Sequence, residues 1–336
     1  MDRRDAILKA VLEADRFHME FDTKSRTAQG SGRIDVFGML VRRDIPVMLR
    51  PLNGLLGAYI TNPDRGVLVT TQRPLSVQRF TAAHELGHAA LGHEASLDEE
   101  QILTRALFVP SSSYDIREIQ ANAFATQLLT PEWLIVQHMK RQGWTRESLT
   151  DPIIVYQLAL RMGSSYSATC YALTEIKAID GTTLEKLQKV KPKEIKQTLA
   201  KPYAPKSWYG DVWQVTERDN GMTLEGSRSD LVVFQFQEHA GSGYLWQFGD
   251  LAEAGLKIVD DGRASRSDRQ HIGGVVFRTI IAEAQEGASG HVHLREVRPW
   301  QAGGEPLQSL ELDVELSGPV AAGLLPKQRK ALLEVA

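Results

Sequence analysis

The sequence has little cysteine and no long apolar run, and these two absences exclude several classes of protein. The single cysteine, Cys170, cannot form an internal disulfide, and its apolar surroundings favour a buried residue over a reactive thiol. No stretch approaches the roughly eighteen apolar residues of a membrane-spanning helix. Charges interrupt MDRRDAILKAVLEADRFH at helical spacing, so it lacks the apolar core of a signal peptide. We expect a cytoplasmic protein.

The chain also lacks a strong excess of charge of either sign. Its formal net charge is -3 and its pI is near 6.3, which argues against a nucleic-acid-binding surface over the whole molecule. Hydrophobic residues make up 42% and charged residues 24%, as in ordinary globular proteins. A length of 336 residues exceeds one ordinary domain and suits two.

The stretch TAAHELGHAALGHE carries the chemistry of the first half. His84 and His88 stack on one face of a helix, one turn apart, and Glu85 flanks them. In His-Glu-x-x-His, the zincin arrangement, two imidazoles hold Zn²⁺ and the glutamate takes a proton from water. His93 should turn away from both histidines. Because Gly92 can end the helix, we expect His93 near the exposed carbonyls, where a partly protonated imidazole is favoured.

A catalytic zinc ion takes a third protein ligand, and the best candidate is in DIREIQANAFATQLLTP. This run is predicted to be a helix that ends before Thr130-Pro131. Glu118 is the candidate ligand, and Asn122, one turn later, could hold a ligand by a hydrogen bond. The alternative is an amphipathic helix that exposes both side chains. Tyr114 is a candidate oxyanion donor in a polar rim, although such a tyrosine more often serves packing.

These motifs resemble the ImmA/IrrE family of zinc metallopeptidases. The resemblance runs over residues 45 to 178 and rests on PLNGLLGAYI, GVLVTT, QRFTAAHELGHAALGH and E-x-x-A-N-x-F-A-x-x-L-L-x-P, in that order. It implies a compact zincin-type domain with a small β-sheet beside the metal helix. It also implies zinc on His84, His88 and Glu118, with Glu85 as general base. Known members cut a helix-turn-helix transcriptional repressor and switch on genes for stress, DNA damage or mobile-element transfer.

Residues 155 to 207 have two further features. The pattern of Val155 to Ile176 is that of a helix-turn-helix with its turn at Gly163. Its second helix carries no Arg or Lys, so direct DNA binding is not expected. We expect the two helices to complete the peptidase core or to form a substrate groove. Residues 181 to 207 are predicted to be a partly helical linker with a solvated basic face. Its lysines are Lys186, Lys189, Lys191, Lys193 and Lys196.

In the second half the apolar residues no longer follow helical spacing. Short runs rich in β-branched and aromatic residues follow one another, and SLELDVEL alternates strictly, which predicts strands with one buried face. The spacing of these strands favours an antiparallel β-sandwich. His291 and His293 share one strand face, where an exposed pair is more common than a metal site.

This half resembles the chagasin family, immunoglobulin-like inhibitors of papain-type cysteine peptidases, over residues 208 to 318. The three signatures are GSGYLW, a Gly-Gly pair and Arg-Pro-Trp. The first loop departs from the family, because His239 to Ser242 stands where the family has Asn-Pro-Thr-Thr, and this puts inhibition in doubt. The loop residues expected to bind a partner are Ser242, Gly243, Tyr244, Trp246, Gly273, Gly274, Arg298, Pro299 and Trp300.

Together these patterns predict an α+β protein. A zincin-like metallopeptidase domain spans residues 1–180, with a helix-turn-helix-like segment at 153–178. The linker at 181–207, an immunoglobulin-like sandwich at 208–318 and a helical tail at 319–336 follow. We expect a zinc endopeptidase whose substrate is a cytoplasmic protein, most often in this family a helix-turn-helix repressor. The alternative is a binding or inhibitor protein that acts through the chagasin-like half, with a regulatory metal domain.

Overall fold

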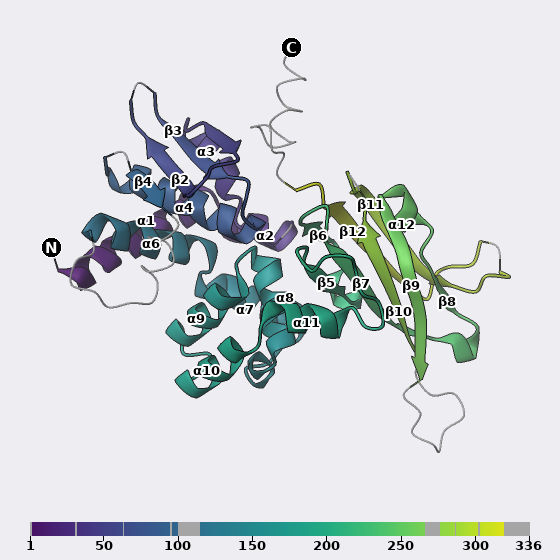
Figure 1. Cartoon of the computed structure of the whole chain (residues 1–336). Coiled ribbons are helices and arrows are strands. Elements are labelled where there is room, and N and C mark those ends of the chain that lie inside the picture. The colour runs from purple at the N-terminus through teal and green to yellow at the C-terminus, as the bar shows by residue number, and fades with distance from the viewer. Residues whose placement is uncertain are drawn as a thin grey trace, which may run out of the picture.

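The computed structural model describes residues 2–30, 32–62, 64–94, 96–99, 115–265, 276–285, 287–301 and 303–318. It mixes helices and sheets in two halves that lie side by side (Figure 1). The first half combines helices with one small sheet, and the second half is built mainly of strands. No helix among these residues is long and apolar enough to cross a membrane.

The first half contains one small sheet of four strands. Its strand order is β1-β3-β2-β4, with β1 parallel to β3 and the other neighbours antiparallel. The strands are β1 (Val47–Arg50), β2 (Leu55–Ile60), β3 (Gly66–Thr70) and β4 (Ser96–Glu99).

Six helices of the described residues accompany this sheet, and α3 and α4 contact its strands directly. Helix α1 buries a stripe of small residues, Ala6, Ala10 and Ala14, and packs along α6. Helix α4 lies against β2 and β3, while α6 ends at Leu129, just before Thr130-Pro131 as predicted. The helices are α1 (Arg3–Glu20), α2 (Thr23–Gln29), α3 (Val36–Arg42), α4 (Leu75–Leu91), α6 (Ile116–Leu129) and α7 (Glu132–Gln142).

The segment with the helix-turn-helix cadence forms α8 (Pro152–Met162) and α9 (Tyr166–Glu175), joined at Gly163 with φ 69°. Every residue of α8 from Val155 to Met162 is buried. On α9, the Tyr166 hydroxyl donates to Leu187 O at 3.0 Å, which ties this helix to the one that follows. The pair therefore packs inside the molecule, in agreement with the expectation that it completes a core.

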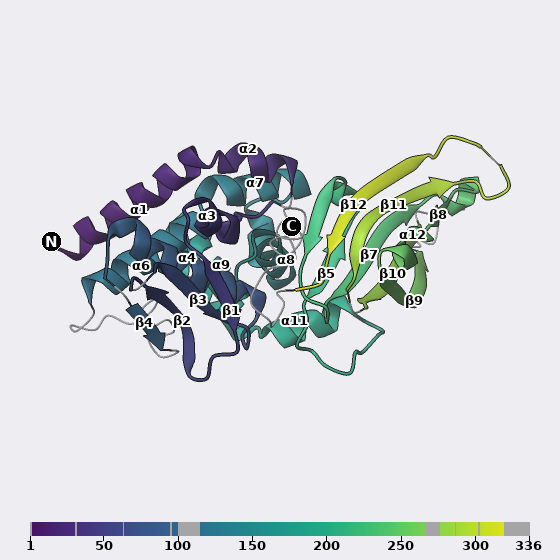
Figure 2. The ribbon, with the colours of Figure 1, turned by 90° about the horizontal axis from the view of Figure 1, so that it is seen from above.

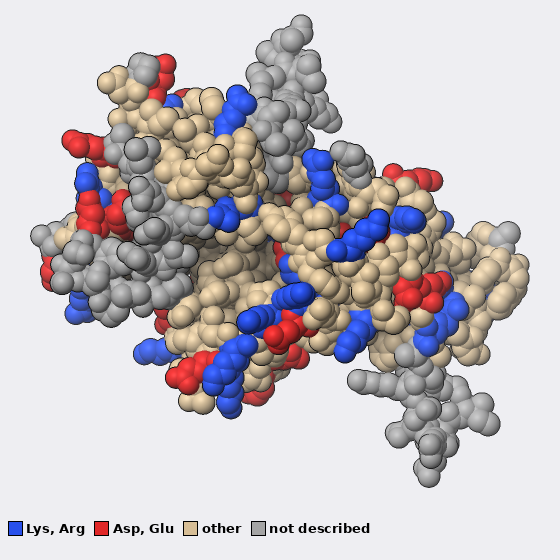
Figure 3. Space-filling view, viewed as in Figure 1, with Lys and Arg blue, Asp and Glu red and all other residues tan. Residues whose placement is uncertain are grey.

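The stretch expected to be a linker forms two packed helices, α10 (Gly181–Lys189) and α11 (Pro192–Leu199). Leu187 and Ile195 are each 2% exposed, so both helices contribute to the core. Four of the five lysines are exposed, and Lys and Arg side chains gather over these helices (Figure 3). The expectation of a solvated Lys196 is wrong, because its side chain is buried and its Nζ lies 3.0 Å from Asp211 Oδ1.

The second half contains two four-stranded sheets, β5-β7-β10-β9 and β6-β12-β11-β8, whose inner faces share one core (Figure 2). Besides a short helix α12 (Asp250–Glu253), it consists of β5 (Val212–Val215), β6 (Met222–Glu225), β7 (Leu231–Glu238), β8 (Leu245–Gln247), β9 (Leu256–Ser265), β10 (Val276–Ala284), β11 (Ser289–Val297) and β12 (Gln308–Glu315).

The expectation of a wholly antiparallel sandwich is wrong at two pairings. Strand β5 runs parallel to β7, and β6 runs parallel to β12. For β5 and β7 the reason is the path of the chain, which leaves the first sheet after β5, returns through β6 in the second sheet and re-enters the first as β7. Two strands of one sheet that are separated by a single return strand in the other must point the same way.

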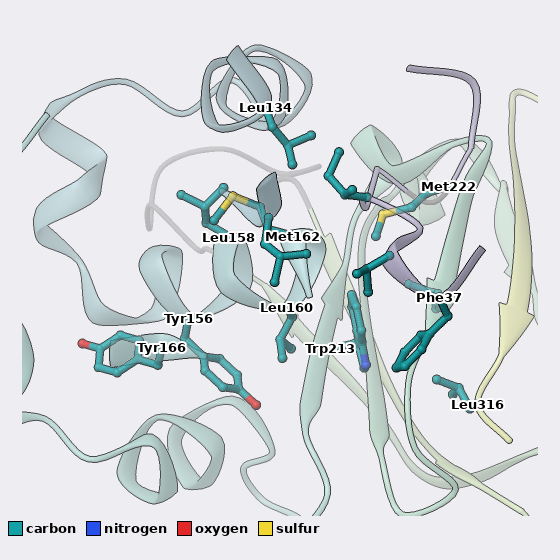
Figure 4. Packing of buried hydrophobic residues seen from close by; sticks show 14 of the residues in the cluster. Phe37, Leu134, Tyr156, Leu158, Leu160, Met162, Tyr166, Trp213, Met222 and Leu316 are labelled. Atoms are coloured by element: carbon teal, nitrogen blue, oxygen red, sulfur yellow. The ribbon is translucent and has the colours of Figure 1, made fainter. Parts of the chain in front are cut away.

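A buried polar network joins the two halves. Asp219 lies 2.9 Å from Arg161 Nη2 of α8, and Gln142 Nε2 of α7 donates to Asp219 at 2.6 Å. Gln157 of α8 donates to Val212 O at 2.8 Å and accepts from Gln214 N at 2.9 Å, so it bonds to the β5 backbone like a neighbouring strand. Apolar contacts surround this network, with Trp213 facing the α8 side chains (Figure 4). Because buried charges are paired and bonded, the halves form one packed unit.

His138 supplies a test of the fold through pH. Its buried Nε2–H donates to Gly32 O at 2.7 Å, and burial lowers the pKa of His138 to about 4. Because the unfolded chain takes up this proton near pH 6.5, stability is full above that pH and falls as the pH drops toward 4. We expect the pH-dependent loss of unfolding free energy between pH 7.5 and pH 5 to be about 2 kcal/mol smaller in His138→Gln, measured by urea unfolding. Equal losses in both proteins would contradict this.

Candidate metal site

The site is built where α4 crosses α6 at close range. Gly87 on α4 faces Ala121 of α6, and a Cβ added to Gly87 would lie 3.2 Å from Ala121 Cα and 3.1 Å from Phe124 Cδ1. Real Cβ atoms seldom come this near to backbone, so only glycine permits the crossing without a shift of one helix. The crossing brings Glu118, in the first turn of α6, to the face of α4 that carries the histidines.

The structure brings the three candidate ligands together. His84 Nε2 lies 3.0 Å from His88 Nε2, and Glu118 oxygens lie 3.2 Å from His84 Nε2 and 3.4 Å from His88 Nε2. Both histidines are buried, whereas the Glu118 side chain is 17% exposed. Among the described residues these three form a group that could hold a metal ion.

The spacing fits zinc. Ligand atoms at about 2.0–2.2 Å from a tetrahedral ion lie about 3.3–3.6 Å from one another. The three observed separations of 3.0, 3.2 and 3.4 Å are close to those edges. Two imidazoles and one carboxylate are also a donor set that zinc accepts, and a fourth position stays available for water or substrate.

Asn122 fixes the orientation of the first histidine. Its Oδ1 lies 3.0 Å from His84 Nδ1. An amide oxygen only accepts, so His84 carries its proton on Nδ1 and keeps the lone pair of Nε2 for the metal side. This is the role expected for Asn122 from its position one turn after Glu118.

His93 does the same for the second histidine, which sequence reasoning missed. Its Nδ1 lies 3.0 Å from His88 Nδ1, and its Nε2 lies 3.2 Å from Gln120 Oε1. Gln120 in turn donates to Ala6 O at 3.4 Å. If the proton chain runs from His88 through His93 to Gln120, every donor meets an acceptor and His88 Nε2 faces the metal side.

The expectation that His93 lies near open carbonyls, partly protonated, is therefore wrong. Gly92 ends α4 as predicted, but its φ of 72° turns the chain back, so that His93 lies beside the helix it follows. Burial is the main cause that lowers the pKa of His93 below its ordinary value. The only signal in the sequence was the left-handed turn that a glycine at this place permits.

Glu85 directly follows His84 on α4 and is fully buried, with β2 packed against this helix. A Cβ added to Gly57 of that strand would lie 3.0 Å from Glu85 Oε1 and 2.3 Å from Thr81 Cγ2. The absence of a side chain at Gly57 therefore leaves the room that the carboxylate occupies. This places a carboxyl group on the ligand helix itself, one residue after His84 and away from bulk water.

The loops of the second half gather six of the expected partner-binding residues, and one expectation fails. The Arg298 guanidinium lies 4.5 Å above the Tyr244 ring, and Arg298 Nε donates to Ser242 O at 3.3 Å. Trp300 is 70% exposed and covers Gly243, and Pro299 is exposed as well. Trp246 does not belong to this surface, because its side chain is buried and its ring centroid lies 4.6 Å from that of Phe236.

Other expected residues lie apart or outside the description. His291 is exposed, with its Nδ1 3.0 Å from Asp313 Oδ1, whereas His293 on the same strand is half-buried. Tyr114, Gly273, Gly274 and residues 319–336 lie outside the described residues.

Comparison with known proteins finds relatives for both halves. Residues 42–174 match a peptidase family described as the IrrE N-terminal-like domain. The radiation response metalloprotease IrrE of Deinococcus radiodurans is 31% identical over 135 residues, 39% of this chain and 37% of that protein. Amoebiasin-2 of Entamoeba histolytica is 27% identical over 108 residues, 32% of this chain and 88% of that protein. A crystal structure of a cysteine protease inhibitor from Entamoeba histolytica covers 32% of this chain and 96% of its own, with 24% identity and a TM-score of 0.29.

Residues 42–174 are therefore similar to the peptidase domain of the IrrE family, and the second half is similar to Amoebiasin-2. Both resemblances seen in the sequence are thereby confirmed. The chain spans little more than a third, 37%, of the length of the Deinococcus metalloprotease.

The close crossing at Gly87 gives a stability test. Gly87→Val should push α6 away, lower the unfolding free energy by about 1–3 kcal/mol and weaken zinc binding, because Glu118 moves with α6. Gly181→Val, where an added Cβ meets nothing within 4 Å, is the matched control. Urea unfolding and zinc competition with a chelator measure both effects. If Gly87→Val has the same unfolding free energy and zinc affinity as the control, the two helices can accommodate a side chain at this position, and the prediction is wrong.

The contact between His93 and His88 gives a test of metal affinity. His93→Ala should weaken zinc binding about 10–100-fold, because the His88 ring loses the partner that orients it. His291→Ala removes an exposed histidine elsewhere and should leave the affinity unchanged. Competition with a chromophoric chelator reports the affinity without any assay of activity. Equal affinities in the two variants would remove His93 from the site.

Proposed function

We propose that this chain is a zinc-dependent endopeptidase. The observation that supports it most is the convergence of His84, His88 and Glu118 to within 3.0–3.4 Å of one another, with Glu85 buried on the same helix. Unrelated buried histidines and glutamates have no reason to meet in the geometry of a zinc site. The match to a metallopeptidase family supports the same reaction class.

In this reaction the residues of the site would have different roles. His84, His88 and Glu118 would hold Zn²⁺, which when bound polarises the scissile carbonyl and supplies hydroxide at neutral pH. Glu85 would accept a proton from water and pass it to the leaving amine. Its fully buried position suits this role, because a desolvated carboxylate is a better base than one in water.

The substrate class is protein, and within that class we propose a cytoplasmic helix-turn-helix transcriptional repressor cut in a stress or mobile-element response. The support is the ImmA/IrrE resemblance together with the Deinococcus relative, which carries the name of a radiation response metalloprotease.

A second candidate function is favoured by the loops of the second half. Tyr244, Arg298 and Trp300 form one surface, and the segment between β11 and β12 lies at the end farthest from the first half (Figure 2). An exposed tryptophan stacked over a glycine beside an arginine and a tyrosine is typical of a protein-binding surface. We propose that this surface, here named the distal loops, binds a protein partner, with papain-type peptidases as the class to test first. Titration of the full chain against such enzymes, beside Trp300→Ala, distinguishes specific inhibition from none.

The endopeptidase proposal is tested by the new protein N-termini that appear in the source cells. Wild type should generate at least one new terminus under stress, whereas Glu85→Gln should bind zinc normally and lose cleavage by about 100-fold or more, because the proton acceptor is gone. Glu118→Gln should lose zinc and cleavage together. Glu185→Gln, an exposed glutamate on α10, is the control and should match wild type. Full cleavage by Glu85→Gln would refute the assigned base.

A further inference from the structure

The lysines of α10, α11 and the segment that follows them form a basic patch on the surface. Residues 181–210 contain seven of the fourteen lysines of the chain, no arginine, and two acidic residues, Glu185 and Glu194. Their formal charge is therefore +5, and because the whole chain has -3, the remainder has -8. Six of the seven lysines are exposed and are here named the lysine patch, namely Lys186, Lys189, Lys191, Lys193, Lys201 and Lys206.

Buried neighbours hold this patch at the surface. Leu187 of α10 and Ile195 of α11 are each 2% exposed and belong to the core, so the opposite faces of both helices point to solvent. Basic side chains gather there in the space-filling view (Figure 3). Among the described residues, none of the six patch lysines forms a hydrogen bond or a close ion pair, whereas the buried Lys196 is paired with Asp211 at 3.0 Å.

Two lysines of the patch are placed against the stability of their own helix. Lys191 is the N-cap of α11 and makes no capping hydrogen bond, and Lys193 lies in the first turn. The N-terminus of a helix carries partial positive charge, so cations are unfavourable there, and Glu194 offsets this only in part. Lys186 and Lys189, by contrast, lie in the last turn of α10, where cations are favoured. Since residues that break a local rule without a gain in folding are expected at functional sites, the lysines of α11 call for a functional explanation.

The composition of the lysine patch distinguishes between anionic partners. Phosphate groups of nucleic acids are favoured by arginine, whose planar fork bonds two oxygens at once, and residues 181–210 contain none. Glu185 and Glu194 are exposed among the lysines, where an unbroken row of phosphates or lipid headgroups would meet them. The charge of -8 on the rest of the chain also repels a polyanion that extends beyond the patch.

A short acidic protein segment avoids all three obstacles. Its carboxylates can pair with lysine ammonium groups one by one, and its uncharged side chains can lie opposite Glu185 and Glu194. Because its charge ends with the segment, it does not meet the acidic remainder of the molecule. Charge complementarity therefore favours a protein partner over a nucleic acid or a membrane.

We propose that the lysine patch is a docking site for a short acidic segment of another protein. Helix α10 packs against α9, and α11 packs against α8 and β5, so the patch rests on elements of both halves. Binding depends on several exposed ion pairs, each of which is weak alone and screened by salt. This inference does not depend on the proposed peptidase activity, because its test measures binding alone.

Fluorescence polarisation with a labelled octaglutamate peptide and the full chain tests the proposal. Binding should weaken about fivefold or more when NaCl rises from about 50 mM to about 200 mM. Lys191→Glu/Lys193→Glu should weaken binding about tenfold or more, because it reverses two charges of the patch. The same variant should raise the melting temperature, because carboxylates suit the N-terminus of α11, and this separates lost binding from unfolding.

The matched control is Lys9→Glu/Lys24→Glu, which makes the same change of net charge at exposed lysines of α1 and α2 and should bind the peptide within about twofold of wild type. A DNA oligonucleotide of the same charge as the peptide, and vesicles of phosphatidylcholine with about 30% phosphatidylserine, test the other anionic partners. Loss of peptide binding in the patch variant alone supports the docking site. The proposal is overturned if the peptide does not bind at about 1 mM in low salt, if both variants weaken binding equally, or if the oligonucleotide or the vesicles bind more tightly than the peptide.

Discussion

The candidate metal site depends on how closely α4 and α6 approach each other. A third ligand thirty residues along the chain from His88 can meet the two histidines only if its helix lies against theirs, and Gly87 removes the side chain that would keep them apart. The same crossing places Asn122 against His84 and Gln120 against His93. One missing side chain therefore permits the ligand set and the hydrogen bonds that orient it.

The junction between the halves is built from charges and amides as much as from apolar contacts. Asp219 of the second half receives Arg161 and Gln142 of the first, and Gln157 bonds to the edge of β5. Partners of this kind are specific in position, so the two halves have a fixed relation. The distal loops, at the far end, are accordingly held away from the metal site, which favours a partner bound in trans over a lid on the same chain (Figure 2).

Sequence patterns predicted the elements of this fold better than their connections. Helical spacing was enough to place His84 and His88 on one face, and the Thr130-Pro131 pair marked the end of α6. It failed at His93, because regular helix rotation does not continue past a left-handed glycine. Sequence reasoning also failed at Trp246, a strand residue near a loop motif whose side chain points inward. It failed at Lys196 as well, because its ion-pair partner Asp211 lies outside the helix that carries Lys196, where a local sequence pattern does not reveal it. Strand direction in the second half depends on which sheet the chain enters, which no local period records.

The left-handed end of α4 constrains the length of the chain as well as its direction. His93 contacts His88 because four residues separate them, the last of which, Gly92, ends the helix and turns the chain back. One residue inserted between them within the helix would rotate the exit by about 100° and shift it by about 1.5 Å, which carries His93 away from the ring it supports. Insertions just after the His-Glu-x-x-His motif should therefore be as damaging to a relative of this chain as changes within the motif itself.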